Sequence, residues 1–194
     1  GGNLNDIINL VKDLRSYSDK IGIVLMGYIA NLYKYPISKF VDDIKKAGAD
    51  AVLVVDAPHE LKEENQLREA LNNNGLSLIK LAAPTTDDKR LKDIVKISSG
   101  FIYNVNVSGV TGVKSANEAD VANFVSRIKK LTDVPVCSGF GIKSPDDAKK
   151  MAKSGCNGVI IGSIFVKYIQ DNLGAAELTQ SFGKEVLSFT EVLK

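Results

Sequence analysis

The sequence predicts an α/β fold of the TIM (β/α)8 barrel class, represented by strands 3 to 8 and their helices. Short apolar runs alternate with amphipathic helical stretches along the whole chain, a pattern typical of either a doubly wound sheet or a TIM barrel. The barrel is favoured because the units follow one another without a long crossover. A complete barrel averages about 250 residues, or about 31 per unit, so we expect residues 1–194 to form a single domain that lacks the first two strands.

The apolar runs are rich in Val, Ile and Leu and do not alternate strictly with polar residues. Such runs are typical of parallel strands that are covered on both faces. We predict strands over residues 21–26, 51–55, 78–82, 101–105, 134–137 and 158–161.

The helical stretches between these runs have their own start and stop signals. The expected starts are Pro36 before a helix over 39–47, Thr85 with Asp88 as a capping box, and Ser144 before Pro145. The expected stops are Gly48, Gly75 and Gly155. Segments 5–17 and 176–193 add a helix at each end.

Composition narrows the class of protein. The chain is 44% hydrophobic and 25% charged, with a formal net charge of +2. Its charges form no basic block, so we expect no nucleic-acid or membrane partner. No apolar run approaches the ~18 residues of a membrane span. Cys137 and Cys156 lie within or beside apolar runs, so we interpret them as reduced structural residues of a cytoplasmic protein.

Glycine-rich turns follow the last three predicted strands. Glycine lets backbone amides approach an anion, and a helix N-terminus adds partial positive charge. Three such turns in succession predict a phosphate cradle, in which Gly139 and Gly141 leave room for oxygens. A tight turn with positive φ is the ordinary explanation for any one of them. Ser163 is either a hydroxyl donor to phosphate or a plain helix N-cap.

Other residues near the strand ends could form a wall around a flat apolar ligand. Tyr28 and Tyr103 end strands, and Leu25, Leu53 and Ile160 are expected to line the interior near the mouth. Core packing is the competing interpretation for all five.

Acid–base candidates are few. His59 is the only histidine and has no neighbouring metal ligands, so we expect it to be incidental and predict no metal site. Asp56 ends a strand in "VVDAPHE", where TIM barrels place catalytic groups, although Asp-x-Pro is also common turn chemistry. No pair of strand-end carboxylates is present.

The sequence resembles the α subunit of tryptophan synthase. The likeness is carried by "LMGYIANLYKYP", "VVDAPHEL", "LAAPTTDDKR", "SGFIYNVNVSGVTG", "VPVCSGFGIKSPDDA" and "GVIIGSIFVKYI", in the family's order and spacing. It implies a lyase that cleaves indole-3-glycerol phosphate to indole and glyceraldehyde 3-phosphate in a retro-aldol step of tryptophan biosynthesis. It also implies an α2β2 heterotetramer with a β subunit that holds pyridoxal phosphate, and no cofactor in this chain.

The resemblance assigns site residues by motif. The substrate would contact Leu25, Leu53, Tyr103, Thr111, Gly112, Gly139, Phe140, Gly141, Ile160, Gly162 and Ser163. The β subunit would contact Tyr28, Asn31, Asp56 and Pro58. Asp56 would then serve communication between the subunits more than chemistry.

The sequence departs from the family pattern in two respects. The family's catalytic glutamate and its partner aspartate, in a "PFSDP…ADGP" segment, have no counterpart in this sequence, so no residue of this chain is assigned a catalytic role. "LMGYIANL" carries one residue more than expected. Two hypotheses follow: a lyase subunit, or a non-catalytic fragment that binds a phosphate ligand and the β subunit. Residues 1–194 alone are expected to be inactive. Another phosphate-binding barrel, such as a ribulose-phosphate epimerase, would need strand-end carboxylates or histidines that are not seen.

Overall fold

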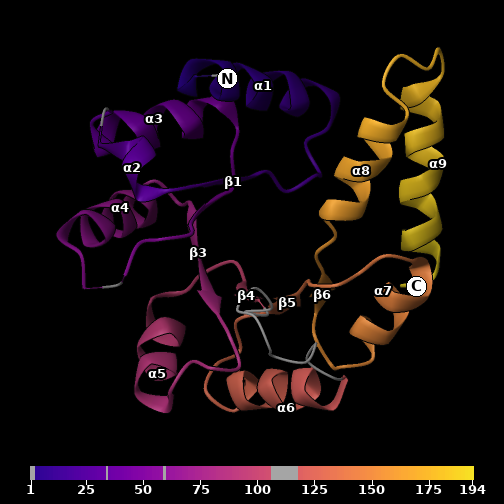
Figure 1. Ribbon diagram of the computed structural model, residues 1–194. Coiled ribbons are helices and arrows are strands. Elements are labelled where there is room, and N and C mark those ends of the chain that lie inside the picture. Colours follow the sequence, from indigo (N-terminus) through magenta and orange to yellow (C-terminus); the bar gives the residue numbers. More distant parts are fainter. Residues whose placement is uncertain (1–2, 34, 59, 106–117) are drawn as a thin grey trace. The chain divides into compact units, whose positions relative to one another are not determined.

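The computed structural model describes residues 3–33, 35–58, 60–105 and 118–194 (Figure 1). The chain divides into two compact units. Unit 1 consists of Gly1–Leu81 with Lys92–Phe101, and unit 2 consists of Ala82–Leu91 with Ile102–Lys194. The expectation of one domain stays a prediction.

Unit 1 contains three neighbouring parallel strands with their helices. The strands pair in register, with Val24 opposite Ala51 and Ala51 opposite Ser77. The elements are α1 Leu4–Tyr17, β1 Val24–Gly27, α2 Ile29–Leu32, α3 Ile37–Ala47, β2 Ala51–Val54, α4 Lys62–Asn73 and β3 Ser77–Ala82, whose last residue belongs to unit 2.

Unit 2 repeats this organisation. Its strands are also parallel, with Tyr103 opposite Cys137 and Cys137 opposite Gly158. The elements are β4 Ile102–Asn104, α6 Glu118–Lys129, β5 Val136–Ser138, α7 Pro145–Ala152, β6 Gly158–Val159, α8 Ser163–Asp171 and α9 Leu178–Glu191. Helix α5, Asp88–Ile97, belongs partly to each unit.

Local signals located most of these elements correctly. Each of the six predicted apolar runs overlaps a parallel strand, which confirms the βα pattern. Ser144 caps α7 by accepting a hydrogen bond from the Asp147 amide. Gly48 ends α3 with a φ of 97°, a conformation that costs glycine no Cβ clash.

The predicted capping box at Thr85 is wrong. Asp87 directly precedes α5, and its Oδ1 accepts a hydrogen bond of 2.8 Å from the Arg90 amide. The Thr86 hydroxyl instead accepts from the Ala83 amide at 3.0 Å. The carboxylate takes the cap because it lies immediately before the helix, where its oxygen reaches the third amide.

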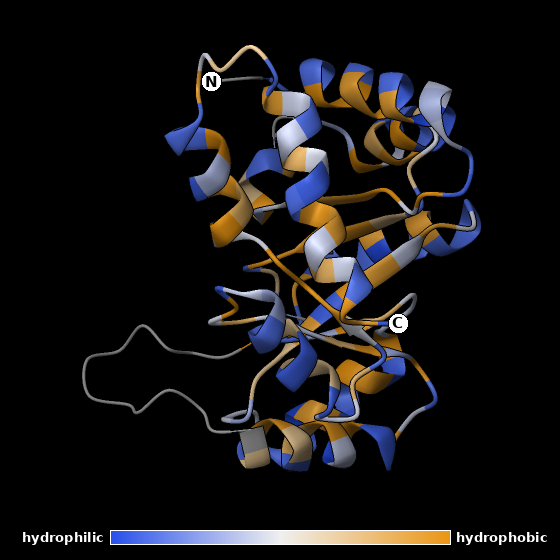
Figure 2. Cartoon of the chain, turned by 90° about the vertical axis from the view of Figure 1, so that its right-hand side faces the viewer, coloured by the Kyte–Doolittle hydropathy of each residue, from blue (hydrophilic) through white to orange (hydrophobic). Residues whose placement is uncertain are grey.

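Each unit has a core between strands and helices. In unit 1 the core is formed by fully buried residues of α3, α4 and β3, among them Ile44, Leu67 and Leu78. In unit 2, Phe189 of α9 is buried against α7 and α8, and its ring meets that of Phe165 edge to face at 5.2 Å. The helices carry apolar and polar residues on different sides (Figure 2). Within the described ranges, no helix is long and apolar enough to cross a membrane.

Candidate functional site

Three parallel strand ends form the centre of the candidate site in unit 2. Because parallel strands share a direction, the carboxyl ends of β4, β5 and β6 lie at one edge. The Tyr103 hydroxyl donates a hydrogen bond of 3.3 Å to the carbonyl of Gly139, just beyond β5. Burial raises the pKa of the Tyr103 hydroxyl above its ordinary value of 10.0, so this group remains a protonated donor at neutral pH.

Gly139 is required for packing against the segment after β6. A Cβ at this position would lie 2.3 Å from the carbonyl oxygen of Ile160 and 2.6 Å from the Ile160 Cβ. The segment that follows β6 therefore approaches the Gly139 backbone too closely for any side chain. Packing is thus one reason for glycine at this position, and the predicted room for phosphate oxygens stays a prediction.

Gly141 has the open surroundings that the sequence suggested for a phosphate cradle. It is exposed, and a Cβ there would meet nothing within 4 Å. Its φ of +66° also favours glycine, as the plain turn explanation requires. Both interpretations of this glycine therefore stay open.

Helix α8 begins at the same edge, and two of its first backbone amides have no acceptor among the described residues. Gly162 is its N-cap and Ser163 its first residue, so the interpretation of Ser163 as an N-cap is wrong. The amides of Phe165 and Val166 donate to the Gly162 carbonyl at 3.0 and 3.1 Å. Among the described residues, the amides of Ser163 and Ile164 have no acceptor. Free amides with the helix dipole behind them form an anion-binding geometry.

The remaining predicted substrate residues of unit 2 fall into two groups. Phe140 and Ile160 are half-buried at the strand ends, and Ile160 follows β6 on the same face as Tyr103 by strand alternation from Gly158. Thr111 and Gly112 lie outside the described residues.

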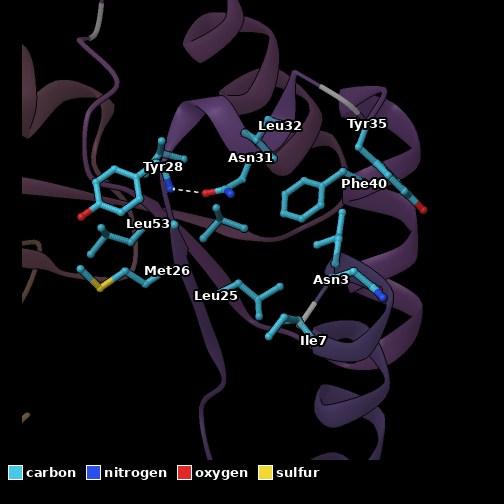
Figure 3. Close-up of a pocket in the computed structure, with 14 residues that line it drawn as sticks. Asn3, Ile7, Leu25, Met26, Tyr28, Asn31, Leu32, Tyr35, Phe40 and Leu53 are labelled. Atoms are coloured by element: carbon cyan, nitrogen blue, oxygen red, sulfur yellow. Dashed lines mark hydrogen bonds between the residues drawn. The ribbon is translucent and has the colours of Figure 1, made fainter. Parts of the chain in front are cut away.

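In unit 1, Leu25 and Leu53 lie on opposite faces of the strands. Leu25 pairs with Val52 and Met26 pairs with Leu53, and successive side chains alternate between faces. Leu25 packs against the helix-covered core with Val52. Figure 3 shows Leu25 directed toward Ile7, whereas Met26 and Leu53 point to the other side.

The prediction that Leu25 lines the interior with Leu53 is therefore wrong. The residue of β1 that shares the face of Leu53 is Met26, which sequence reasoning missed. The extra residue in "LMGYIANL" was the available signal, because a shift of one position moves a strand residue to the other face.

A cavity of about 510 Å³ lies beside β1 in unit 1 (Figure 3). Leu25, Tyr28, Asn31 and Leu53 contribute to its lining together with residues of α1 and α3. Most of these side chains are apolar.

The residues assigned to a partner surface lie on α2 and on the loops after β1 and β2 in unit 1. Tyr28, Asn31, Asp56 and Pro58 are all exposed. The Tyr28 amide donates to Asn31 Oδ1 at 3.0 Å, and the Ile29 amide donates to Asp56 Oδ1 at 2.7 Å. The Asp56 carboxylate thus joins the loop after β2 to the start of α2.

A buried ion pair below these loops was also missed by sequence reasoning. Lys80 Nζ of β3 lies 2.9 Å from Glu64 Oε1 of α4, and the two side chains are 7% and 0% exposed. The lysine within the apolar run "LIKLAA" was the only local signal.

No metal centre is evident in the part of the chain that the structure describes. Those residues contain no group of three or more His, Cys, Asp or Glu side chains that could hold an ion. His59 lies outside them. Cys137 and Cys156 are free thiols.

Comparisons with known proteins agree on one family. The profile of the family "Tryptophan synthase alpha chain" matches residues 1–191. The tryptophan synthase alpha chain of Caulobacter vibrioides is 42% identical over 187 residues, which cover 96% of this chain and 66% of that protein. The tryptophan synthase alpha chain of Phenylobacterium zucineum is 39% identical over 193 residues, which cover 100% of this chain and 68% of that protein. The chain thus spans about two thirds of these relatives' length.

Solved structures lead to the same group. The alpha subunit of tryptophan synthase from Legionella pneumophila superposes with a TM-score of 0.86 at 26% identity, over 98% of this chain and 69% of that chain. A chain of the tryptophan synthase complex from Pyrococcus furiosus superposes with a TM-score of 0.83 at 30% identity, over 98% and 74%. The similarity confirms the predicted TIM-barrel fold class.

Proposed function

Because this chain belongs to the tryptophan synthase alpha chain family, we propose that it functions as an α subunit of that enzyme in the cytoplasm. The proposed activity is that of a carbon–carbon lyase: retro-aldol cleavage of indole-3-glycerol phosphate to indole and glyceraldehyde 3-phosphate. The observation that carries the proposal is the grouping of Tyr103, Gly139 and the segment after β6 at one edge of unit 2.

The proposed phosphate site is the N-terminus of α8. The unaccepted amides of Ser163 and Ile164 would donate to phosphate oxygens, and Gly162 presents no side chain in front of them. Such a contact is worth about 0.3–1 kcal/mol at an exposed helix end. The Ser163 hydroxyl and the open space at Gly141 would contribute further contacts.

The proposed wall around the indole consists of apolar and aromatic side chains. Phe140 and Ile160 are half-buried beside Tyr103, and such surfaces suit a flat apolar ring. The Tyr103 hydroxyl is held by the Gly139 carbonyl, which limits the orientations of its ring.

Cleavage also needs an acid and a base that move protons. Asp56 lies two residues beyond the carboxyl end of β2, and its Oδ1 already accepts a hydrogen bond from the Ile29 amide. We therefore assign Asp56 to contact with the β subunit and not to chemistry. The α2β2 assembly, with pyridoxal phosphate held by the β subunit, is part of the same proposal.

A binding titration tests the phosphate site. The probe is an indole alkyl phosphate that lacks the cleavable hydroxyls, followed by calorimetry. Ser163→Pro removes one amide donor at a position where proline is compatible with a helix, and we expect it to raise the Kd on the order of fivefold. Ser163→Ala keeps the amide but, like Ser163→Pro, lacks the hydroxyl, so the fivefold difference in Kd is measured between these two variants. Unchanged binding by Ser163→Pro would contradict this site.

Indole release from indole-3-glycerol phosphate separates the two hypotheses. No acid–base pair is assigned among residues 1–194, and removal of positioned acid–base groups lowers rates by about 10²- to 10⁴-fold. We therefore expect residues 1–194 to bind the probe and to release indole at least about 10²-fold more slowly than a complete α subunit. Release at the rate of a complete α subunit would show that the chain contains catalytic groups that we have not assigned.

A further inference from the structure

Lys80 makes two contacts that join separate elements of unit 1. Its Nζ donates to Glu64 Oε1 at 2.9 Å and to the carbonyl of Ala57 at 3.0 Å. Ala57 is buried in the loop after β2, between the exposed residues Asp56 and Pro58. The ammonium group thus tethers that loop to β3, while Glu64 provides the opposite charge.

Stability alone does not account for this pair. Removing two charges from water offsets much of their attraction, and well-packed apolar residues often replace a buried ion pair without loss of stability. The second oxygen of Glu64 is buried and has no hydrogen-bond partner among the described residues, so the pair is incompletely satisfied. What an apolar side chain cannot replace is the hydrogen bond to the Ala57 carbonyl.

The tether continues through the neighbouring residue to a second loop. Asp56 Oδ1 accepts a hydrogen bond of 2.7 Å from the Ile29 amide, at the first residue of α2. Lys80 therefore fixes Ala57, and Asp56 fixes the loop after β1. Tyr28 of that loop and Asn31 of α2 are joined by their own hydrogen bond of 3.0 Å.

We infer that Lys80 and Glu64 are positioning residues that hold the loops after β1 and β2 in the shape that the β subunit recognises. The inference rests on the proposed function for the identity of the partner. A surface ordered before binding loses less conformational entropy on association. Without the tether, Asp56 is less ordered before binding, so association with the β subunit is weaker. This effect does not require Lys80 or Glu64 to be exposed, and neither is.

The key variant is Lys80→Met with Glu64→Leu. It removes both charges together, so it avoids an unpaired buried charge and is expected to fold. We expect its Kd for the β subunit of the same organism to rise on the order of tenfold. We also expect faster hydrogen exchange of the Ile29 amide in the absence of partner. Val125→Ala, in the core of unit 2, is the control for a general loss of stability.

The two readouts separate the possible failures. A double variant with the parental Kd and parental Ile29 exchange would overturn the positioning role. If the parent chain does not bind the β subunit, the proposed partner is wrong, and Ile29 exchange alone then decides whether the tether exists. The single variant Lys80→Met is the second test. If the Ile29 amide exchanges at the same rate in this variant and in the parent, the tether is contradicted.

Discussion

The carbonyl oxygen of Ile160 lies 2.3 Å from the position that a Cβ on residue 139 would occupy. A side chain and a backbone atom cannot share this space, so the segments after β5 and β6 are in contact only because residue 139 is glycine. The same close approach holds the carbonyl that accepts the hydrogen bond of Tyr103. Packing and the arrangement of the candidate site thus depend on one residue.

Gly139→Ala is expected to destabilise the chain. The added methyl group would have to displace backbone, which typically costs about 1–3 kcal/mol. Urea unfolding measures the change. Gly22→Ala is the control, because a Cβ there meets nothing within 4 Å and its φ is not positive. An equal loss of unfolding free energy in Gly139→Ala and Gly22→Ala would contradict the close approach of Ile160 to residue 139.

Leu25→Ala is expected to reduce stability more than Met26→Ala does. Leu25 packs against the helix-covered core, so its truncation should lower the free energy of unfolding by about 1–2 kcal/mol. Met26 is 62% exposed, and its truncation should cost less than about 0.5 kcal/mol. The reverse pattern would show that the two strand faces are misassigned.

The Asp147 carboxylate is expected to contribute to acid sensitivity. Hydrogen bonds from the Lys143 amide and the Ser144 side chain lower the pKa of Asp147 below its ordinary value of 3.8. Because the pKa of Asp147 is lower in the folded chain than in the unfolded chain, its carboxylate stabilises the native state at pH values above the unfolded pKa. This contribution is lost as the pH falls through the folded pKa. Urea midpoints measured from pH 5 to pH 2 should therefore fall less in Asp147→Asn than in the parent.

Asp146→Asn is the matched control for this pH series. It removes the same charge from the same helix turn but does not touch the bonds to Lys143 and Ser144. An equal pH dependence in Asp147→Asn and the parent would contradict the assignment.

The thiol of Cys137 is expected to react slowly in the native chain. Burial, and to a smaller degree Cys156, raise the pKa of Cys137 above its ordinary value of 9.0, and the thiolate is the reactive form. Alkylation of the Cys156→Ser variant at pH 8 should be on the order of tenfold slower when folded than in urea. Equal rates would mean that Cys137 is open to solvent.

The sequence by itself determined the fold class, the order of the strands and most helix ends. These features depend on signals between near neighbours, such as the apolar runs, the Ser144 cap and the positive φ of Gly48. Such signals are readable because each acts within a few residues. The motifs of the strand ends also identified the family.

Tertiary structure alone decided which residues meet. A shift of one position separates Leu25 from Met26, and only the pairing with β2 determines which of them shares a face with Leu53. Gly139 is needed because of Ile160, and Lys80 is paired with Glu64 on another element. These relationships join residues that are distant in the sequence. Steric contact and burial depend on which residues are neighbours in space, and local sequence patterns do not encode those neighbours.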